Sequence, residues 1–497
     1  MGARLRGSPT SRFAVNAGIN LLIHAAPVLG RVQPLRRAAV RMAERYLQEM
    51  SQIGIESGFR LRAVEQDRYD LGVALVSTIE RAIVGDRLSL ATRRTVLRTL
   101  VRDNLMFHGN WEAKEGFRQR NGVLPPDLML VSPGKACNLR CVGCYADSGN
   151  DREKLAWTVL EQLIGDAHDH FGNRFFVISG GEPLAYHSEG RGILDLAERF
   201  PDSFFLMYSN GTLIDDAVAQ RMARLGNVTP AISVEGMREH TDQRRGAGVF
   251  DRILAAMERL RREKVAFGIS LTATKHNSDE LLSEEVVDFF FRQQGALYAW
   301  IFHYMPIGRS FTLDLLPTPE QRVRLWKRTW EVIREHRIFL ADFWNMATVT
   351  DGCISAGREG GYLCVDWNGA VTPCVFMPYS PANVNKVFAS GGTMEDVWRE
   401  PFFAGVRSWQ KGYGFHDPTK SEKSNWLMAC PIRDHHRDLR QILMEHEPDP
   451  ADDNARQALL DPEYAAGMIA YDDALEDLTG PIWDKQYLGK NGHDGDD

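Results

Sequence analysis

The chain has 497 residues, of which 44% are hydrophobic and 10% aromatic, so it is long enough for two or three globular domains. A net charge of −7 argues against nucleic acid as the main partner, and no apolar run approaches the roughly 20 residues of a membrane-spanning helix. Seven cysteines in an acidic chain of this size are not typical of a secreted disulfide framework, which predicts a reducing, cytoplasmic location.

The first 43 residues contain seven arginines and no acidic residue, around the stretch FAVNAGINLLIHAAPVLG. Asn16, Asn20 and His24 interrupt this stretch, which makes it a poor signal-peptide core. Two interpretations stay open: a basic amphipathic helix in peripheral contact with a membrane or a partner, and a helix that packs on the rest of the protein. Residues 1–120 are expected to form a helical region, because apolar residues recur at three- and four-residue spacing.

From residue 128 onward, short β-rich runs alternate with helical runs. LMLVSPG, RFFVISGGEP and SFFLMYSNG are the first three of six predicted strands, with five helices between them. This alternation predicts an α/β core of parallel strands over residues 121–312, as in a doubly wound sheet or a partial barrel. In both folds the loops at the carboxyl ends of the strands carry the chemistry.

Three further segments follow the predicted core. Residues 313–349 are expected to form bridging helices, with a start marked by proline. Residues 350–440 are richer in glycine, proline and cysteine, and DWNGAVTP predicts a hairpin with Asn368-Gly369 at its turn. Residues 441–497 are expected to form a helical extension that ends in an acidic, disordered tail.

Cys137, Cys141 and Cys144 lie within eight residues, directly after the first predicted strand. A loop with this spacing can place three thiolates on three irons of a cubane cluster and leave the fourth iron without a protein ligand. An open position is useful where something must bind and react, as at catalytic zinc. The alternative is a zinc knuckle with a distant fourth ligand, for which His168 and His170 are candidates.

The remaining cysteines form a second group: Cys353, Cys364, Cys374 and Cys430. Four thiolates are enough for one closed [4Fe-4S] cluster or for one structural zinc ion. The seven cysteines divide into groups of three and four, with none left over. Cysteines scattered along a chain as small core hydrophobes would not be expected to divide in this way. The sequence therefore predicts two metal centres and leaves the metal of the second one open.

CNLRCVGC, followed after the next strand by SGGEP, resembles the radical S-adenosylmethionine (radical SAM) superfamily. The resemblance implies a partial (β/α)6 TIM-like barrel and a [4Fe-4S] cluster whose open iron is chelated by S-adenosylmethionine. It also implies that an electron, from a reductant such as a ferredoxin or flavodoxin, cleaves this cosubstrate to a 5′-deoxyadenosyl radical. That radical removes a hydrogen atom from a substrate, so the missing fourth ligand would be the cosubstrate.

The same resemblance assigns residues at the strand ends to the cosubstrate. Gly180 and Gly181 would let the backbone approach a ligand closely. Glu182 and Pro183 suit a fixed turn whose polar groups meet the methionine ammonium. Polar residues after later strands are expected to contact the ribose or the carboxylate, with a solvated loop residue or a helix cap as the alternative for each. These candidates are Asn210, Ser233, Glu235, Arg245 and Thr272.

One position departs from the family. Gly143 precedes the third cysteine, where the family has an aromatic residue, and Tyr145 is expected to pack against the adenine in its place. The second cysteine group resembles the SPASM or Twitch extensions of the superfamily, because Cys353 and the GAVTPC run match their opening. This resemblance favours a second, auxiliary [4Fe-4S] cluster, and structural zinc remains the alternative.

Three side chains near the barrel mouth are candidates for the reaction itself. Tyr208, His303 and Tyr304 could each exchange a proton or hydrogen atom with a substrate radical, and aromatic packing is the alternative for each. Strand alternation predicts that His303 and Tyr304 lie on opposite faces. The SPASM resemblance favours an unidentified peptide or protein substrate. A lipid at a membrane surface is the alternative, and a non-catalytic metal-binding or electron-transfer protein is the interpretation from another class.

Overall fold

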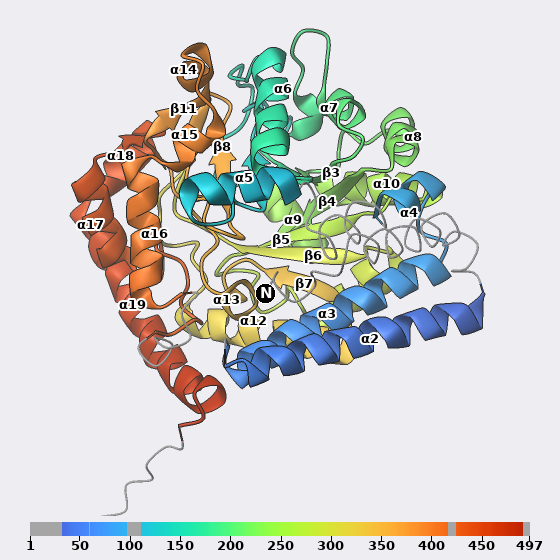
Figure 1. The fold of residues 1–497 in the computed structure, drawn as a ribbon. Helices are drawn as coiled ribbons and strands as arrows, with labels where there is room; N and C mark the ends of the chain where they lie inside the picture. The colour runs from blue at the N-terminus through green and yellow to red at the C-terminus, as the bar shows by residue number, and fades with distance from the viewer. Residues whose placement is uncertain (1–31, 59, 97–110, 416–423, 491–497) are drawn as a thin grey trace, which may run out of the picture.

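A computed structural model describes residues 32–58, 60–96, 111–415 and 424–490. Within these residues ten strands form one sheet in the order β11-β9-β8-β1-β2-β3-β4-β5-β6-β7 (Figure 1). Neighbours from β1 to β6 pair in parallel, so the predicted α/β class with a partial barrel is confirmed. These strands are β1 (Leu128–Val131), β2 (Phe175–Ile178), β3 (Phe204–Ser209), β4 (Val228–Val234), β5 (Gly268–Ala273) and β6 (Tyr298–His303).

The barrel sheet is longer at both ends than the sequence predicts. β7 (Phe339–Asp342) pairs in parallel with β6, although it lies in the segment expected to hold only bridging helices. β8 (Tyr362–Val365) pairs in parallel with β1 and so joins the cysteine-rich segment to the barrel. β8 belongs to the predicted hairpin, but no local pattern indicates that it pairs with β1; β7 is hidden because only two residues separate it from the helical run that ends at His336.

Aromatic side chains fill the space between β7 and β8, the two ends of this parallel run. The rings of Phe343 and Tyr362 are 6.2 Å apart, and those of Trp344 and Phe376 are 4.9 Å apart. Such ring contacts stabilise the closure beyond their buried area. The barrel and the cysteine-rich segment therefore share one core.

The predicted hairpin forms between β8 and β9 (Ala370–Thr372), with Gly369 at a φ of +84° in its turn. That left-handed conformation favours glycine. β11 (Ala382–Asn383) pairs with β9, and a separate two-stranded sheet joins β10 (Tyr379–Ser380) to β12 (Asp449–Pro450).

Helices connect the barrel strands and lie outside them in Figure 1. The helix that follows β6, α12 (Pro319–Glu331), begins at a capping box of Thr318 and Gln321 with proline at its first turn, as the sequence predicts. The other helices of this part are α6 (Trp157–Asp166), α7 (Ile193–Arg199), α8 (Asp216–Leu225), α9 (Arg238–Arg245), α10 (Val249–Arg262) and α11 (Glu284–Val287). Short continuations and connectors are η2 (Ala167–Phe171), η3 (Pro183–Ala185), η4 (Asp288–Gln293) and η5 (Val332–His336).

A second group of helices packs beside the cysteine-rich segment and includes the long red helix α19 of Figure 1. The predicted acidic tail, residues 491–497, lies outside the described residues. The helices are α13 (Ala347–Thr350), α14 (Val384–Ala389), α15 (Met394–Trp398), α16 (Pro401–Tyr413), α17 (His436–His446), α18 (Asp453–Leu460), α19 (Pro462–Ile482) and η7 (Trp483–Tyr487).

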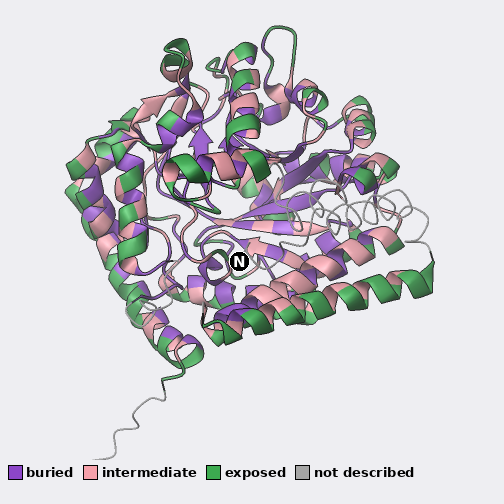
Figure 2. Ribbon diagram, in the orientation of Figure 1, coloured by how far each residue is buried: buried purple, intermediate pink, exposed green. Residues whose placement is uncertain are grey.

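The N-terminal helices are α2 (Gln33–Glu56), α3 (Arg62–Val84), α4 (Leu90–Thr95) and α5 (Trp111–Asn121). α2 and α3 lie side by side, and α3 contacts β7. The outer face of α2 is exposed (Figure 2). The predicted basic amphipathic segment lies mostly in residues 1–31, outside the described residues. None of the helices described is both long and apolar enough to cross a membrane.

Candidate active site

A cavity of about 190 Å³ lies inside the barrel, and every strand from β1 to β6 contributes to its wall. Cys137, Cys141 and Cys144 line this cavity together with side chains from the carboxyl ends of the strands. The wall at the amino ends of the strands is apolar, with Leu128 as the first residue of β1 and Phe175 as the first residue of β2. One space thus connects the cysteine loop to the interior of the barrel, as expected for a ligand site of a parallel α/β fold.

The three cysteines are free thiols within electrostatic reach of one another. Burial, the Glu182 carboxylate and the other two cysteines raise the pKa of the Cys137 thiol to about 11. The backbone N–H of Leu139 and the Asn210 amide donate to its sulfur at 3.4 and 3.7 Å. Donors aimed at sulfur favour a thiolate ligand.

The arrangement of thiols fits a cluster rather than a zinc knuckle. Among the described residues, no three His, Cys, Asp or Glu side chains stand close enough to hold one metal ion. A zinc ion needs its sulfur ligands about 2.3 Å from one centre, whereas a cubane takes one thiolate on each iron. His168 is also committed elsewhere, because its ring nitrogens lie 2.7 and 3.0 Å from Asp169 and Asp202.

The loop after β6 holds the cysteine loop in place. The backbone N–H of Arg309 donates to Cys144 O at 3.0 Å, and its guanidinium donates to the carbonyls of Cys141 and Ser148. Gly308, at a φ of +71°, leaves no room for a side chain, since a Cβ there would lie 2.0 Å from Tyr145 O. No sequence pattern indicates these contacts, because they join residues more than 160 positions apart.

Gly180 and Gly181 pack against the cysteine loop itself. A Cβ on Gly181 would lie 2.2 Å from Ala136 O, and a Cβ on Gly180 would lie 2.6 Å from Gly134 O. The N–H of Gly181 donates to Gly134 O at 2.9 Å. Both glycines also line the cavity. Their close approach is therefore to the backbone before the first cysteine, and it positions the cavity wall.

Glu182 is turned toward the end of β3. Its carboxylate accepts hydrogen bonds from Ser209 Oγ and the backbone N–H of Asn210, both at 2.8 Å. Only 1% of Glu182 is exposed, and burial raises the pKa of its carboxyl. Pro183 opens the short helix η3. Neither Glu182 nor Pro183 is among the residues that line the cavity, and the contact of this turn with the methionine ammonium stays a prediction.

Glu235 supports two arginines and does not line the cavity. Its Oε1 accepts from Arg244 Nη1 at 2.6 Å and from Arg245 Nε at 2.8 Å. Although burial opposes it, the charges of Glu235, Cys141 and Cys144 raise the pKa of Arg245. Arg245 therefore stands beside the cysteines, where a carboxylate ligand could pair with it. The sequence singled out Arg245 but missed Arg244, which lines the same wall.

The smaller polar candidates lie where the sequence predicts, at the wall of the cavity. Asn210 is oriented by Asn138, whose Oδ1 accepts from its amide at 2.9 Å. Ser233 Oγ lies 3.3 Å from Ser270 Oγ on the neighbouring strand. Thr272 lines the cavity from β5. The hydroxyls of Ser233 and Thr272 are available to a polar ligand, whereas the amide of Asn210 is engaged by Cys137, Asn138 and Thr212.

Two tyrosines surround the position where the family pattern departs. Gly143 has a φ of +62°, and a Cβ there would lie 2.7 Å from Cε2 of Tyr304. The ring of Tyr304 thus occupies the space beside Gly143. Tyr145 lines the cavity with its hydroxyl 2.7 Å from Ser179 Oγ, and its ring packs on Phe376.

The three candidates for the reaction all line the cavity, but only one has a free polar group. The structure describes no hydrogen bond of the Tyr208 hydroxyl, and its ring packs on Phe302 at 5.1 Å. His303 is 1% exposed with both ring nitrogens engaged. The Tyr304 hydroxyl donates to the carbonyls of Ser310 and Thr312. His303 and Tyr304 share the cavity, contrary to the predicted opposite faces, because β6 ends at His303.

The second cysteine group divides into three and one. The charges of Cys353 and Cys430 both contribute, after burial, to the raised pKa of Cys374. Burial and the Asp366 carboxylate raise the pKa of the Cys364 thiol. The charges of the other three cysteines do not contribute to this shift. Cys364 shares the inward face of β8 with Tyr362, two residues away, which lines the cavity.

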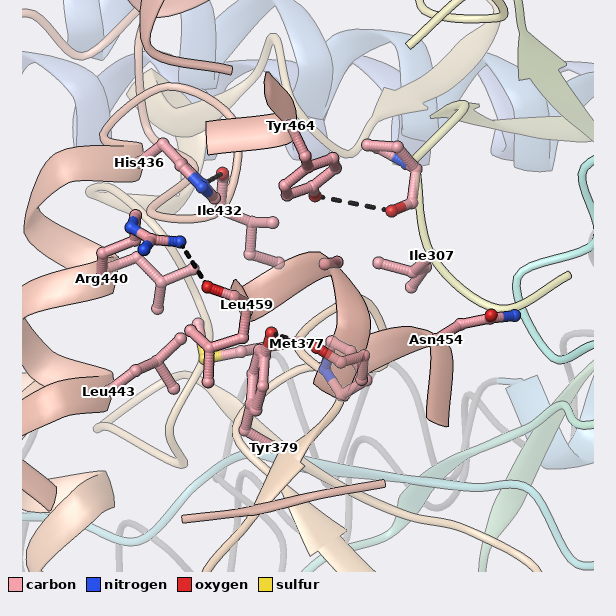
Figure 3. Close-up of a pocket in the computed structure, with 15 residues that line it drawn as sticks. Ile307, Met377, Tyr379, Ile432, His436, Arg440, Leu443, Asn454, Leu459 and Tyr464 are labelled. Carbon is pink, nitrogen blue, oxygen red and sulfur yellow. Dashed lines mark hydrogen bonds between the residues drawn. The ribbon is translucent and has the colours of Figure 1, made fainter. Parts of the chain in front are cut away.

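A second pocket, of about 20 Å³, lies between the loop after β6 and helices α17, α18 and α19 (Figure 3). Its wall is mostly apolar, and Tyr464 donates to Pro306 O at 3.5 Å across one side. None of the residues predicted from the sequence is among the described residues that line it. The larger cavity is therefore the candidate active site.

Comparison with known proteins agrees with this geometry. Residues 131–284 match the Radical SAM superfamily. The AdoMet-dependent heme synthase of Methanosarcina barkeri is 24% identical over 297 residues, which cover 52% of this chain and 80% of that protein. The mycofactocin maturase MftC of Mycobacterium ulcerans is 29% identical over 299 residues, which cover 58% and 78%. SuiB of Streptococcus suis bound to S-adenosylmethionine shares the fold, with a TM-score of 0.51 at 18% identity over 65% of this chain and 76% of that one.

Proposed function

Residues 131–284 form a radical SAM domain, and from this premise we propose that the protein abstracts a hydrogen atom from a peptide or protein substrate inside the barrel. The observation that carries the proposal is the single cavity that joins the three cysteines to the aromatic barrel wall. The alternative of a non-catalytic electron carrier leaves this cavity without a role.

The protein's own residues have separate tasks in this proposal. Cys137, Cys141 and Cys144 would hold a [4Fe-4S] cluster, which with S-adenosylmethionine supplies the 5′-deoxyadenosyl radical. Arg245 would pair with the carboxylate of the cosubstrate. Of the three candidates for the reaction on the cavity wall, Tyr208 alone has a free polar group, and its hydroxyl would give a hydrogen atom or a proton to the substrate.

A peptide substrate is supported by the relatives named as maturases, such as MftC. A relative named as a heme synthase acts on a different class of molecule, so membership of the superfamily does not by itself give the substrate. We include a cytoplasmic location and a ferredoxin- or flavodoxin-like reductant in the proposal, because the cluster needs a low-potential electron.

The test is formation of 5′-deoxyadenosine by anaerobically reconstituted, dithionite-reduced protein with S-adenosylmethionine. A peptide fraction of a cell extract is expected to accelerate this formation, and protease treatment of the fraction should abolish the acceleration. Acceleration by a protease-resistant lipid extract would move the proposal to the lipid alternative. Absence of 5′-deoxyadenosine from iron-loaded protein would contradict the proposal as a whole.

A lipid substrate at a membrane surface is the second candidate, and helix α2 favours it. Leu35, Met42, Tyr46 and Ile53 are 49–68% exposed. Their spacing of seven, four and seven residues places them on one face of the helix. Exposed arginines of the same helix (Arg37, Arg41 and Arg45) would attract anionic lipid headgroups.

Vesicle co-sedimentation separates the two candidates. The full chain would sediment with phosphatidylglycerol vesicles if α2 lies on a membrane, and Met42→Ser with Tyr46→Ser would abolish the binding. Met444→Ser with Leu460→Ser is the matched control, because these side chains are 66% and 75% exposed on other helices. A wild-type protein that stays in the supernatant would remove the membrane contact.

A further inference from the structure

A buried polar network runs from the cavity wall toward the second cysteine group. His303 Nε2 lies 3.3 Å from Asp342 Oδ2, and His303 Nδ1 lies 3.3 Å from Nη2 of Arg433. A guanidinium can only donate, so Nδ1 accepts from Arg433 and the ring proton is on Nε2, toward Asp342. Burial lowers the pKa of His303 to about 4, which keeps the ring neutral. Arg433 therefore fixes the tautomer of a cavity-wall residue.

Arg433 has more donors than the protein satisfies. It is fully buried, with its guanidinium 5.2 Å from the ring of Trp344 and 5.6 Å from that of Tyr471. Its Nε and Nη1 are among the buried atoms for which the described residues provide no hydrogen-bond partner. A buried N–H group without an acceptor loses the hydrogen bond that water gives it in the unfolded chain, which is unfavourable. These two N–H groups therefore indicate an acceptor other than a protein side chain.

The neighbouring carboxylate is committed to another arginine. Asp434 Oδ1 lies 3.6 Å from Arg433 Nε, beyond hydrogen-bond distance. Arg322 binds both oxygens of Asp434, with Nη2 at 2.8 Å from Oδ2. The backbone N–H of Cys430 also donates to Oδ2, at 3.1 Å. Asp434 thus ties Cys430 to Arg322 and pairs in charge with Arg433 without accepting a hydrogen bond from it.

Arg433 stands next to the gathered thiols. It follows Cys430 by three residues; burial raises the pKa of that thiol, and the charge of Arg433 acts in the opposite direction. Cys353 and Cys374 are the electrostatic neighbours of Cys430. A thiolate-ligated cluster at this place would supply the anionic acceptors that the guanidinium lacks, since sulfur atoms of clusters accept N–H donors.

We propose that Arg433 donates its two free N–H groups to an auxiliary iron–sulfur cluster held by Cys353, Cys374 and Cys430, raises the reduction potential of that cluster, and positions His303 with its third donor group. The proposal rests on the auxiliary cluster that the proposed function includes. One-electron reduction makes a cluster more negative, so a fixed cation beside it in a low-dielectric interior stabilises the reduced form. The electron in the test below comes from dithionite through mediators.

The experiment is an EPR-monitored redox titration of the full-length chain with Cys137, Cys141 and Cys144 replaced by alanine, so that only the second cluster gives a signal. In this background Arg433→Met is expected to lower the ratio of reduced to oxidised cluster at least tenfold at a fixed potential. That ratio corresponds to 59 mV for one electron. Arg433→Lys keeps the charge and should recover part of the shift.

Arg407→Met is the matched control. Arg407 also stacks on a tryptophan, 4.0 Å from the ring of Trp398, but its guanidinium donates to the carbonyls of Ala356 and Trp398. Its variant should leave the titration unchanged. An unchanged potential in iron-loaded Arg433→Met protein would overturn the proposal while leaving the auxiliary cluster in place. If the parent chain, with Cys137, Cys141 and Cys144 replaced by alanine, holds no iron, both this proposal and the auxiliary cluster are wrong. That result would not contradict the radical SAM site.

Discussion

The two cysteine groups are built in opposite ways. Cys137, Cys141 and Cys144 come from a single loop and line the main cavity. Cys353, Cys374 and Cys430 come from three separate segments, and none of them is among the described residues that line that cavity. A local loop leaves one side of a metal centre open for a reactant, whereas ligands from three segments enclose it. The first group suits chemistry on a substrate, and the second suits electron transfer or structure.

Their surroundings differ in the same sense. The first group is held by backbone hydrogen bonds and by Arg309, which leave the cavity side free. The second is crossed by a network that ties α12 to the segment before α17 through Arg322 and Asp434. Loss of the first centre should therefore abolish activity without unfolding the chain, and loss of the second should affect stability as well.

The largest expected effect comes from removing one ligand of each centre. Cys144→Ala should lose about four irons per chain and reduce 5′-deoxyadenosine formation to background, because the cluster is then held by two thiolates. Cys430→Ala should lose the other iron and lower the thermal midpoint, but still form 5′-deoxyadenosine. Iron and sulfide analysis with a cleavage assay measures both. Equal loss of cleavage in the two variants would contradict the division of roles.

Within the second group, Cys364 and Cys353 should behave differently. Cys353→Ala is expected to release the iron of the second centre, since Cys353 contributes to the electrostatic environment of Cys374 and Cys430. Cys364→Ala should retain that iron, because the charges that raise the pKa of the Cys364 thiol do not include those of the other three cysteines. The measurement is iron per chain and the EPR signal of the second cluster. Iron loss in Cys364→Ala would restore the four-cysteine ligand set expected from the sequence.

The first centre depends on a glycine far away in the sequence. Gly308→Ala should destabilise the fold by more than about 4 kcal/mol, because the new Cβ would force the backbone at Tyr145 to move. Gly190→Ala is the control: its φ is +76° but nothing lies within 4 Å of the new Cβ. Its cost should be about 1–2 kcal/mol. Denaturant unfolding measures both, and equal costs would contradict the close contact.

The contrast between the two groups also explains what the sequence could predict. The first group was readable because Cys137, Cys141 and Cys144 lie in eight residues, and SGGEP follows at a fixed place in a β/α unit. The six strands and the α/β class followed from periodicity for the same local reason. Tyr208 and Asn210 were found because they sit at the end of β3, where parallel folds gather their functional side chains. Arg245, at the end of α9, was found because an arginine fork can pair with a carboxylate.

The features that the sequence did not reveal depend on distant contacts. Counting predicted four ligands for the second group, but only the folded chain shows that the charged neighbour of Cys364 is Asp366 and not another cysteine. β7 was missed because only two residues separate it from the helical run that ends at His336. Arg433 and its link to His303 join positions 130 residues apart. No periodicity or motif encodes such a contact.

The smallest effect expected is a pH dependence of stability that belongs to the second region. Burial, with the charges of Asp434 and Asp473, raises the pKa of Asp472 to about 8. Between the ordinary value of 3.8 and about 8, the folded protein holds a proton that the unfolded chain has released. The free energy of unfolding therefore falls as the pH rises through this window and levels off above it.

Asp472→Asn removes this dependence, because asparagine has no proton to lose. Its thermal midpoint relative to wild type should increase between about pH 6 and about pH 8.5, by roughly 2 °C or more. Asp477→Asn is the control, since Asp477 is exposed on the same helix and is not among the charges that raise the pKa of Asp472. A parallel shift of both variants with pH would place the sensitivity outside Asp472. A shift in Asp472→Asn alone would show that the enclosed region, and not the open one, responds to pH in this range.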